Sequence, residues 1–430
     1  MSSVSANKTD SLSSYSKIQP DSTIKPRMLD GLAKKILLKQ LSLISRGKLT
    51  LKDGEEIYQF GEKTSENDLS VTLEVHDSRF YSDVSFGGSI GAGEAYMFGY
   101  WTVSDLTKLI QIFSINSHAM ENIEGGLANL TVPIQKILHW FNRNTQTGSR
   151  KNIAAHYDLG NDLFEIMLDE TMMYSSAIFK NEEQSLYDAQ IDRLDSICQQ
   201  LDLTESDQLL EIGTGWGGLS IHAAKNYGCH VTTTTISKEQ YTLAKERIKK
   251  EGLEDKITVL FEDYRDLNGQ YDKLVSVEMI EAVGHQYYET YFEKCSKLLK
   301  PNGLMLIQAI TIADQQFEAA KKSIDFIKRY IFPGSCIPSN TALLSAVTNS
   351  SDLRLYQLTD IGPHYATTLK RWRENIFANL DKVKQIGYSD EFIKMWEFYL
   401  CYCEGGFKER VISDVHMLLV KPDNRCEHLL

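Results

Sequence analysis

Short apolar runs recur along the second half of the chain, with helical segments between them. These runs predict strands at 208–212, 230–235, 257–262, 274–278 and 303–309. Strands that alternate with helices in this way form a parallel sheet covered by helices, and ligands bind such sheets at the carboxyl ends of the strands. The pattern therefore predicts an α/β fold with its functional site at that edge.

The first part of the chain has a different pattern, in which polar and apolar positions alternate. We expect 71–75 and 79–84 to be strands of a small sheet, and the glycine-rich stretch 87–96 to be a turn before a helix. A polar segment rich in helix breakers follows at 143–150 and marks a domain boundary. The predicted organisation is a disordered tail at 1–24, a small α+β domain at 25–145, and a catalytic domain at 146–430 with a helical, substrate-covering insertion at about 311–400.

Composition narrows the class of protein. The chain has 430 residues, of which 42% are apolar, and this is enough to form the hydrophobic cores of two domains. The seven cysteines are scattered without the spacing of a zinc site or a disulfide framework, which fits a reducing cytoplasm and predicts no metal. No apolar run has the length of a membrane span. A formal net charge of −12 argues against general binding of nucleic acids, which are polyanions.

Positive charge nevertheless gathers in one segment. Seven basic residues between 25 and 48 stand against the single acid Asp30, and apolar residues from Leu29 to Ile44 fall on one helical face. A basic amphipathic helix can lie on an anionic lipid surface. A surface helix docked on its own domain has the same pattern, so both interpretations stay open.

Four glycines within six positions follow the strand at 208–212, before a helix expected at about 219–226. Gly213, Gly215 and Gly218 match a dinucleotide-binding pattern that is weak by itself. Two observations favour S-adenosylmethionine instead. Glu211 suits a cationic aminocarboxypropyl group better than a pyrophosphate, and the next strand does not end in the acid that binds the ribose of NAD. A glycine turn without a ligand is the alternative.

Acidic residues follow the third and fourth strands. Asp263 and Tyr264 are placed to bind the adenine amino group and to stack on its ring, although an acid there could simply cap a helix.

Glu278 and Glu281 come after the fourth strand, and the apolar neighbours of Glu281 predict burial. A buried carboxylate needs hydrogen-bond donors, for which Gln308 and Tyr365 are candidates.

Aromatic residues are dense after the last of these strands. They include Phe326, Tyr330, Phe332, Tyr356, Trp372, Phe377, Trp396, Tyr399 and Tyr402. Rings in such a helical segment often roof an apolar substrate pocket, although any one of them could simply be part of the core.

Several motifs, in order along the chain, resemble the cyclopropane-fatty-acyl-phospholipid synthases and the related mycolic-acid methyltransferases. They are 156–164, 173–179, the glycine-rich loop, 235–240, 263–267, 330–334 with 338–339, and 404–407, together with 91–97 and Trp101 in the leading domain. The likeness covers nearly everything beyond the tail. It implies a Rossmann-like methyltransferase domain of class I, dependent on S-adenosylmethionine.

The resemblance also implies a reaction, in which the methyl group of S-adenosylmethionine is added across a cis double bond of a phospholipid acyl chain. An alkene is a poor nucleophile, so catalysis depends on positioning. Aromatic faces can stabilise the resulting carbocation, and a base then removes a proton so that the ring closes. In this family the base is understood to be a bound bicarbonate ion.

By resemblance, the bicarbonate is held by Ser176, Glu281, Gln308, Tyr365 and the backbone of Ile310. Two of these residues depart from the best-known pattern, because many members have cysteine at the first position and histidine at the third. A hydroxyl can donate as a thiol does, whereas a glutamine amide cannot take up a proton. The changes also permit a methyl-branched product.

The resemblance places the cofactor against a second set of residues. They are Tyr174, Ser175, Gly213, Gly215, Thr235, Gln240, Asp263 and Tyr264, with Glu211 acting through water. For the segment after the second strand, a bland alternative is that Ser237 caps a helix and Gln240 lies on its exposed face.

The sequence thus predicts a cytoplasmic enzyme on the inner face of the membrane that acts on unsaturated phospholipid in the bilayer. The alternatives are a lipid methyltransferase that gives methyl-branched chains and a lipid-binding protein without activity. Glu211 and Asp263 count against the latter, since a binding module does not need them. The sequence neither demands nor excludes a homodimer.

Overall fold

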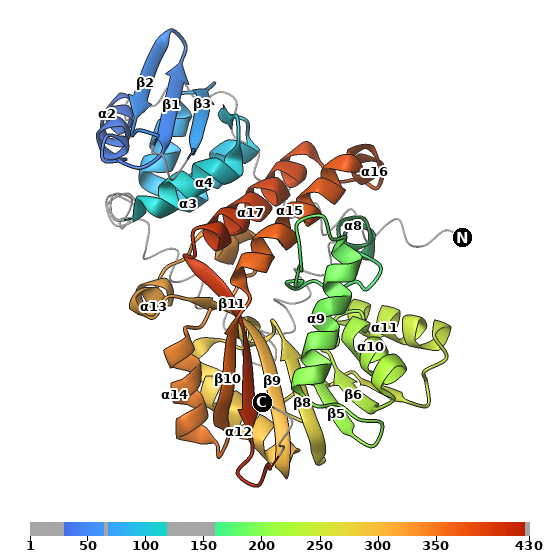
Figure 1. Cartoon of the computed structure of the whole chain (residues 1–430). Coiled ribbons are helices and arrows are strands. Elements are labelled where there is room, and N and C mark those ends of the chain that lie inside the picture. The colour runs from blue at the N-terminus through green and yellow to red at the C-terminus, as the bar shows by residue number, and fades with distance from the viewer. Residues whose placement is uncertain (1–29, 64–67, 118–159, 426–430) are drawn as a thin grey trace.

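The computed structural model describes residues 30–63, 68–117 and 160–425. The predicted tail at 1–24, the boundary at 143–150 and the start of the 156–164 motif lie outside the described residues. The described residues form a small N-terminal unit and a large α/β unit joined through two long helices (Figure 1).

The large unit is built on a seven-stranded sheet with the order β10-β11-β9-β8-β5-β6-β7. The strands are β5 (Gln208–Ile212), β6 (His230–Thr234), β7 (Ile257–Leu260), β8 (Tyr271–Val277), β9 (Leu299–Ile312), β10 (Arg354–Asp360) and β11 (Ile412–Val420). The five predicted strands are confirmed and run parallel to one another. The last two pair antiparallel and were not predicted. The residues of β10 are nearly all exposed, so the sequence of this strand contains no buried apolar run from which it could be predicted.

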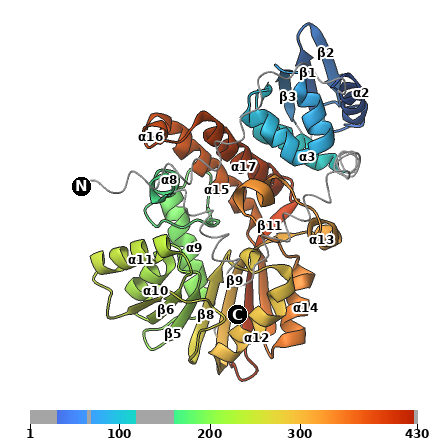
Figure 2. The ribbon, with the colours of Figure 1, turned by 180° about the vertical axis from the view of Figure 1, so that it is seen from behind.

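Helices cover both faces of this sheet (Figures 1 and 2). One face carries α9 (Leu186–Gln200), α10 (Gly218–Tyr227) and α11 (Lys238–Lys250), and the other carries α12 (Tyr288–Leu298) and α14 (Asn340–Ser350). Neighbouring strand residues explain the two layers, because Leu209 faces the first core and Leu210 the second. The predicted α/β fold is confirmed.

Further helices lie above the carboxyl ends of the strands (Figure 1). They are α8 (Asn161–Met167), α13 (Asp314–Ala320), α15 (Gly362–Ala378), α16 (Leu380–Gln385) and α17 (Asp390–Lys408), with a short π-helix at Ile327–Ile331. Most of the predicted aromatic roof is buried here, with Phe326 and Trp372 fully enclosed. Tyr356 and Phe377 are exceptions, because both side chains are exposed on the surface.

The N-terminal unit contains a four-stranded sheet with the order β2-β1-β3-β4 and three helices. Its elements are α2 (Asp30–Leu41), β1 (Lys48–Asp53), β2 (Glu56–Phe60), β3 (Ser70–Val75), α3 (Arg79–Met97), β4 (Trp101–Val103) and α4 (Leu106–Ile115). The strand predicted at 79–84 is wrong, because this segment begins α3. The turn predicted at 87–96 is also wrong, since it lies within α3, which kinks at Gly88 with φ of 56°. The adjacent buried rings of Phe80 and Tyr81 fit a helix face and not an alternating strand.

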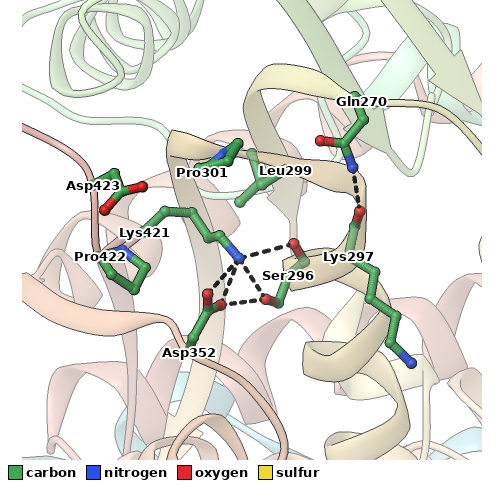
Figure 3. A pocket seen from close by; sticks show the side chains of 9 residues that line it. All are labelled: Gln270, Ser296, Lys297, Leu299, Pro301, Asp352, Lys421, Pro422 and Asp423. Carbon is green, nitrogen blue, oxygen red and sulfur yellow. Dashed lines mark hydrogen bonds and ion pairs between the residues drawn. The ribbon is translucent and has the colours of Figure 1, made fainter.

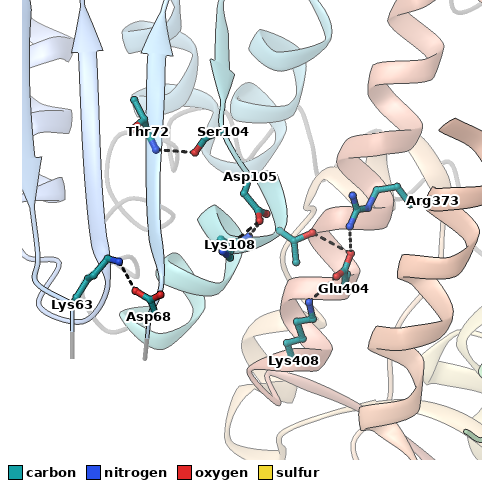
Figure 4. A network of polar contacts seen from close by, with 10 residues as sticks. Lys63, Asp68, Thr72, Ser104, Asp105, Lys108, Arg373, Glu404 and Lys408 are labelled. Carbon is teal, nitrogen blue, oxygen red and sulfur yellow. Dashed lines mark hydrogen bonds and ion pairs between the residues drawn. The ribbon is translucent and has the colours of Figure 1, made fainter. Parts of the chain in front are cut away.

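Polar contacts attach the N-terminal unit to α17 (Figure 4). The Thr107 hydroxyl of α4 donates to Glu404 at 3.1 Å, and this carboxylate also accepts from Arg373 of α15 and from Lys408, each at 2.8 Å. A side chain at Gly405 would clash with Ile110, so the two helices meet closely. The N-terminal unit therefore packs directly on the helices that cover the sheet.

The basic segment from the sequence analysis forms α2, which buries Ala33, Leu37 and Leu41 against its own unit. The helix is therefore docked on its own domain, which was one of the two interpretations of the sequence, and Lys34 forms ion pairs with Asp53 and Glu56. The opposite side of the helix stays exposed. Within the described ranges, no helix is both long and apolar enough to cross a membrane.

A hollow of about 380 Å³ lies at the other end of the sheet, where β9 begins (Figure 3). Lys421 crosses it and donates to Asp352 at 2.6 Å and to the Ser296 hydroxyl at 3.0 Å. These charges satisfy one another, and the hollow is remote from the carboxyl ends of the strands. The Lys421 contacts therefore fix the end of β11 against its neighbours.

Candidate active site

The glycine-rich loop joins β5 to α10 in a conformation that needs glycine. Gly213, Gly215 and Gly217 have φ values of 103°, 52° and 85°, in the left-handed region that side chains disfavour. A Cβ atom built on Gly215 would meet nothing within 4 Å, whereas one on Gly218 would lie 2.5 Å from the Thr171 carbonyl oxygen. The loop is thus packed on one side and open at Gly215, which fits a cofactor in that position.

Glu211 lies beneath this loop and is nearly inaccessible. Its carboxylate accepts a hydrogen bond from the Ser220 hydroxyl at the start of α10. Burial raises the pKa of Glu211 to about 7, and hydrogen bonds from Ser220 and Thr233 oppose the shift. In this arrangement Glu211 holds the loop to its neighbours, and its contact with a cofactor stays a prediction.

Thr235 and Gln240 are brought together after β6. The Thr235 hydroxyl donates to Gln240 Oε1 at 2.9 Å, and both side chains are buried. Ser237 caps α11 by accepting from the Gln240 N–H at 3.3 Å. The cap alternative is therefore confirmed for Ser237, whereas the exposed position for Gln240 is wrong.

Asp263 follows β7 and forms an ion pair with Arg265, with the closer contact at 2.7 Å. It also accepts from the Arg265 N–H, which makes a local turn and not a helix cap. Tyr264 packs edge-on against Tyr291. The expected adenine contacts of Asp263 and Tyr264 remain predictions.

Tyr174 and Ser175 lie side by side in sequence but in different surroundings. The Tyr174 ring packs beside Phe164 and Trp372, and its hydroxyl lies 2.8 Å from that of Tyr399. The Ser175 hydroxyl accepts from the buried Arg193 at 3.0 Å. The segment thus joins the aromatic roof to a buried polar cluster.

Glu278 is the centre of that cluster. It directly follows β8 and has φ of 46°. Its Oε1 accepts from the Ser176 N–H and from Gln308 Nε2, both at 2.8 Å. Its Oε2 accepts from the Tyr365 hydroxyl at 2.6 Å. Three of the residues that the resemblance gives to an anion site therefore converge on a carboxylate of the protein itself.

Glu281 lies one helical turn further on. Its Oε1 accepts from the Ile310 N–H at 2.6 Å, and its buried Oε2 has no hydrogen-bond partner among the residues that the structure describes. The hydrogen bonds expected from Gln308 and Tyr365 to Glu281 are not formed, because both side chains donate to Glu278. Burial and the charge of Glu278 raise the pKa of Glu281 to about 8, so this carboxyl is mostly protonated at neutral pH.

Arg193 and Asp414 complete the charges, and both are fully buried. Burial lowers the pKa of Arg193 to about 10, against the attraction of Glu278 and Asp414. Burial and the charge of Glu278 raise the pKa of Asp414 well above its usual range. Burial also raises the pKa of Glu278, but the Tyr365 hydroxyl, the Ser176 N–H and Arg193 oppose this shift. Because Glu278 accepts three hydrogen bonds, we place the negative charge there.

His416 orients the amide of Gln308. Burial lowers the pKa of His416 to about 3, so the ring is neutral. Its Nε2 lies 3.2 Å from Gln308 Oε1, which directs the amide nitrogen to Glu278 and to Asp414 at 2.8 Å. Sequence reasoning missed Arg193, Asp414 and His416. Each of them is a charged or polar residue within an apolar strand or helix face. Such a residue needs a buried partner, and this could have identified it from the sequence.

Comparisons with known proteins bear on the family and the fold. A family model described as mycolic acid cyclopropane synthetase matches residues 144–417. The cyclopropane-fatty-acyl-phospholipid synthase of Escherichia coli is 37% identical over 79% of this chain and 85% of its own. The tuberculostearic acid methyltransferase of Mycobacterium tuberculosis is 36% identical over 78% and 79%. The solved cyclopropane synthase MmaA2 from the same organism has a TM-score of 0.59 and 29% identity, and covers 63% of this chain and 98% of its own.

The open side of the glycine loop gives a first prediction. Gly215→Asp should weaken binding of S-adenosylmethionine by at least tenfold, as calorimetry would measure, because its carboxylate would enter the open space. The fold should survive, since an aspartate tolerates this φ better than most residues. Gly252→Asp is the matched control, with φ of 67° and equally open space beyond α11. Equal affinities for the two variants would contradict the assignment.

The protonated state of Glu281 gives a second prediction. The folded carboxyl, with a pKa of about 8, holds its proton over a range in which the unfolded chain, near 4.5, has lost it. Rising pH therefore favours unfolding across this window. Glu281→Gln removes this dependence, so its stability relative to the parent should rise by about 1–3 kcal/mol between about pH 5 and about pH 9. Urea unfolding at both values measures it, and a constant difference would refute it.

Proposed function

The chain belongs to the mycolic acid cyclopropane synthetase family, and we propose that it converts a cis double bond of a phospholipid acyl chain into a cyclopropane ring. At the coarser level it is a lipid methyl- or methylene-transferring enzyme that uses S-adenosylmethionine. That cofactor supplies an electrophilic methyl group when bound. The single observation that carries the proposal is the position of Tyr365, which joins a buried carboxylate to an aromatic enclosure.

The proposed cofactor position lies at the carboxyl ends of β5, β6 and β7. Gly215 provides the open side of the loop, and Gln240 and Asp263 follow the two neighbouring strands. These residues fit an amino acid joined to a nucleoside, because they offer close backbone approach, an amide and a carboxylate in sequence along one edge. In this proposal they bind and orient the cofactor.

The proposed reaction centre lies beside it, where β8 and β9 end. The Tyr365 ring stacks on Phe407 with centroids 4.4 Å apart and meets the edge of Trp372 at 6.0 Å, while its hydroxyl holds Glu278. Aromatic faces and a buried negative charge both stabilise a carbocation on the acyl chain. Exclusion of water by the same rings prevents that cation from being captured before the ring closes.

A methyl-branched product is the second candidate, favoured by two observations. Gln308 occupies a position where the resemblance expects histidine, and a relative that is 36% identical is a tuberculostearic acid methyltransferase. Methyl transfer to the alkene is common to both outcomes, and they diverge at the fate of the cation.

Methyl-labelled S-adenosylmethionine and vesicles of unsaturated phospholipid test the proposal directly. We expect label in the acyl chains and cyclopropane protons in their NMR spectrum, because ring formation adds CH₂. A reduced methyl branch would add two hydrogens more in mass analysis. Vesicles of saturated phospholipid with the same headgroup are the control. No transfer of label to the unsaturated chains would refute the enzymatic proposal and favour a lipid-binding role.

We propose that the exposed side of α2 contacts the lipid surface. Leu32 and Leu43 are 55% and 53% exposed, and Lys35 and Lys39 are exposed beside them, whereas Lys34 is held by its ion pairs. An apolar side chain flanked by free lysines suits the boundary of an anionic bilayer.

Replacing Lys35 and Lys39 with glutamine should reduce binding to anionic vesicles by tenfold or more, at about 1 kcal/mol for each lysine. Cosedimentation measures the change. The matched control replaces Lys249 and Lys250, which are exposed on α11 in the large unit. Equal loss in both double variants would show that only overall charge matters and would refute the role of α2.

A further inference from the structure

Bicarbonate does not fit the site that the resemblance gives it. The Ser176 N–H, Gln308 Nε2 and the Tyr365 hydroxyl all donate to Glu278. The Ile310 N–H donates to Glu281, and the Ser176 hydroxyl donates to the Ala177 carbonyl oxygen at 3.0 Å. The Ser176 and Ile310 N–H groups, the Gln308 amide and the Tyr365 hydroxyl, which would hold a free anion, are therefore engaged by carboxyl groups of the protein.

The balance of charge gives the same answer. Arg193 is the buried cation that acts on this cluster, and the negative charge of Glu278 already faces it. A bicarbonate ion beside Glu278 would place a second negative charge in the same low-dielectric site. Two negative charges so near each other in a buried site would need a further cation to compensate them.

The backbone at Glu278 is also specialised. Its φ of 46° places a long side chain in a region that favours glycine, which is an unfavourable conformation. The Glu278 N–H donates to the Gln308 carbonyl oxygen at 2.8 Å and so fixes this geometry. An unfavourable conformation whose side chain is held by three donors indicates a function for that side chain.

We propose that the Glu278 carboxylate replaces bicarbonate and is itself the base of the reaction. The inference rests on the proposed function. Once the methyl carbon has bonded to one alkene carbon and S-adenosylhomocysteine has departed, a cation remains on the other alkene carbon. Glu278 takes a proton from the new methyl group, and the freed C–H electron pair closes the ring. The proton then leaves the Glu278 carboxyl to water, which restores the carboxylate.

Geometry gives Glu278 an advantage over a diffusing ion. A covalently attached base, held by Ser176, Gln308 and Tyr365, loses little entropy when the lipid binds. The neutral amide of Gln308 suffices at a position where the resemblance expects histidine, because it needs only to donate to the carboxylate. His416 and Asp414 act as positioning residues through that amide.

The parent enzyme provides the first test. Its turnover of labelled methyl groups into unsaturated phospholipid should be the same in carbonate-free buffer and with added bicarbonate. Turnover that requires added bicarbonate would overturn the inference while leaving the proposed function intact. If no methyl group is transferred under either condition, the proposed function itself fails, so the two failures are distinguishable.

Two substitutions provide the second test. Glu278→Gln keeps an acceptor oxygen for the Ser176 N–H and the Gln308 amide, and its own amide nitrogen can donate to the Tyr365 hydroxyl. It cannot take the proton, so kcat should fall at least about 100-fold with cofactor affinity and lipid KM nearly unchanged. Glu278→Gly suits the positive φ and opens the anion position, so its turnover should be restored by added bicarbonate or formate. Calorimetry with S-adenosylmethionine confirms that each variant is folded. Parental kcat in Glu278→Gln, or no rescue of a cofactor-binding Glu278→Gly, would refute the role.

Discussion

The attraction between two buried charges, the Glu278 carboxylate and the Arg193 guanidinium, organises the centre of this molecule. Both groups lie where solvent cannot compensate their charge, so each depends on the field of the other and on donors or acceptors from surrounding elements. This constraint also acts on the neighbouring acids. Burial and the charge of Glu278 raise the pKa of both Glu281 and Asp414, because a further negative charge would lack a partner.

The antiparallel addition to the parallel sheet supplies this cluster. In the register of β9 and β11, His416 lies opposite Gln308 and Asp414 lies opposite Ile310. Gln308 in turn lies opposite Val277 of β8, the residue before Glu278. Three strands thus bring polar residues to one edge, whereas their centres are mainly apolar because both faces of the sheet are covered.

Sequence patterns predicted what depends on local interactions. The five parallel strands were recognised because each is a short run rich in apolar and β-branched residues, and the glycine loop because its φ values leave few alternatives to glycine. The segment at 79–84 was misread, since adjacent rings at Phe80 and Tyr81 give no clear period over six residues. The site was predicted only in part. Tyr365 and Gln308 donate hydrogen bonds to Glu278 and not to the acid one turn further on. This choice depends on the backbone geometry at the end of β8, which no local sequence pattern indicates.

The helices α15 and α17 connect the N-terminal unit to the Glu278 cluster through direct side-chain contacts. Tyr365 and Arg373 belong to the same helix, α15, about two turns apart. The first holds Glu278 in the reaction centre, and the second pairs with Glu404 of α17, which also accepts from Thr107 in the N-terminal unit. The Glu404 carboxylate is almost completely buried, so removing any one of its donors would leave a charge poorly compensated. The unit proposed to meet a lipid surface is therefore fixed in relation to the carboxylate proposed as the base. Both ends of the Glu404–Phe407 segment take part in these contacts. Glu404 accepts from Thr107 of the N-terminal unit, and Phe407 stacks on the Tyr365 ring.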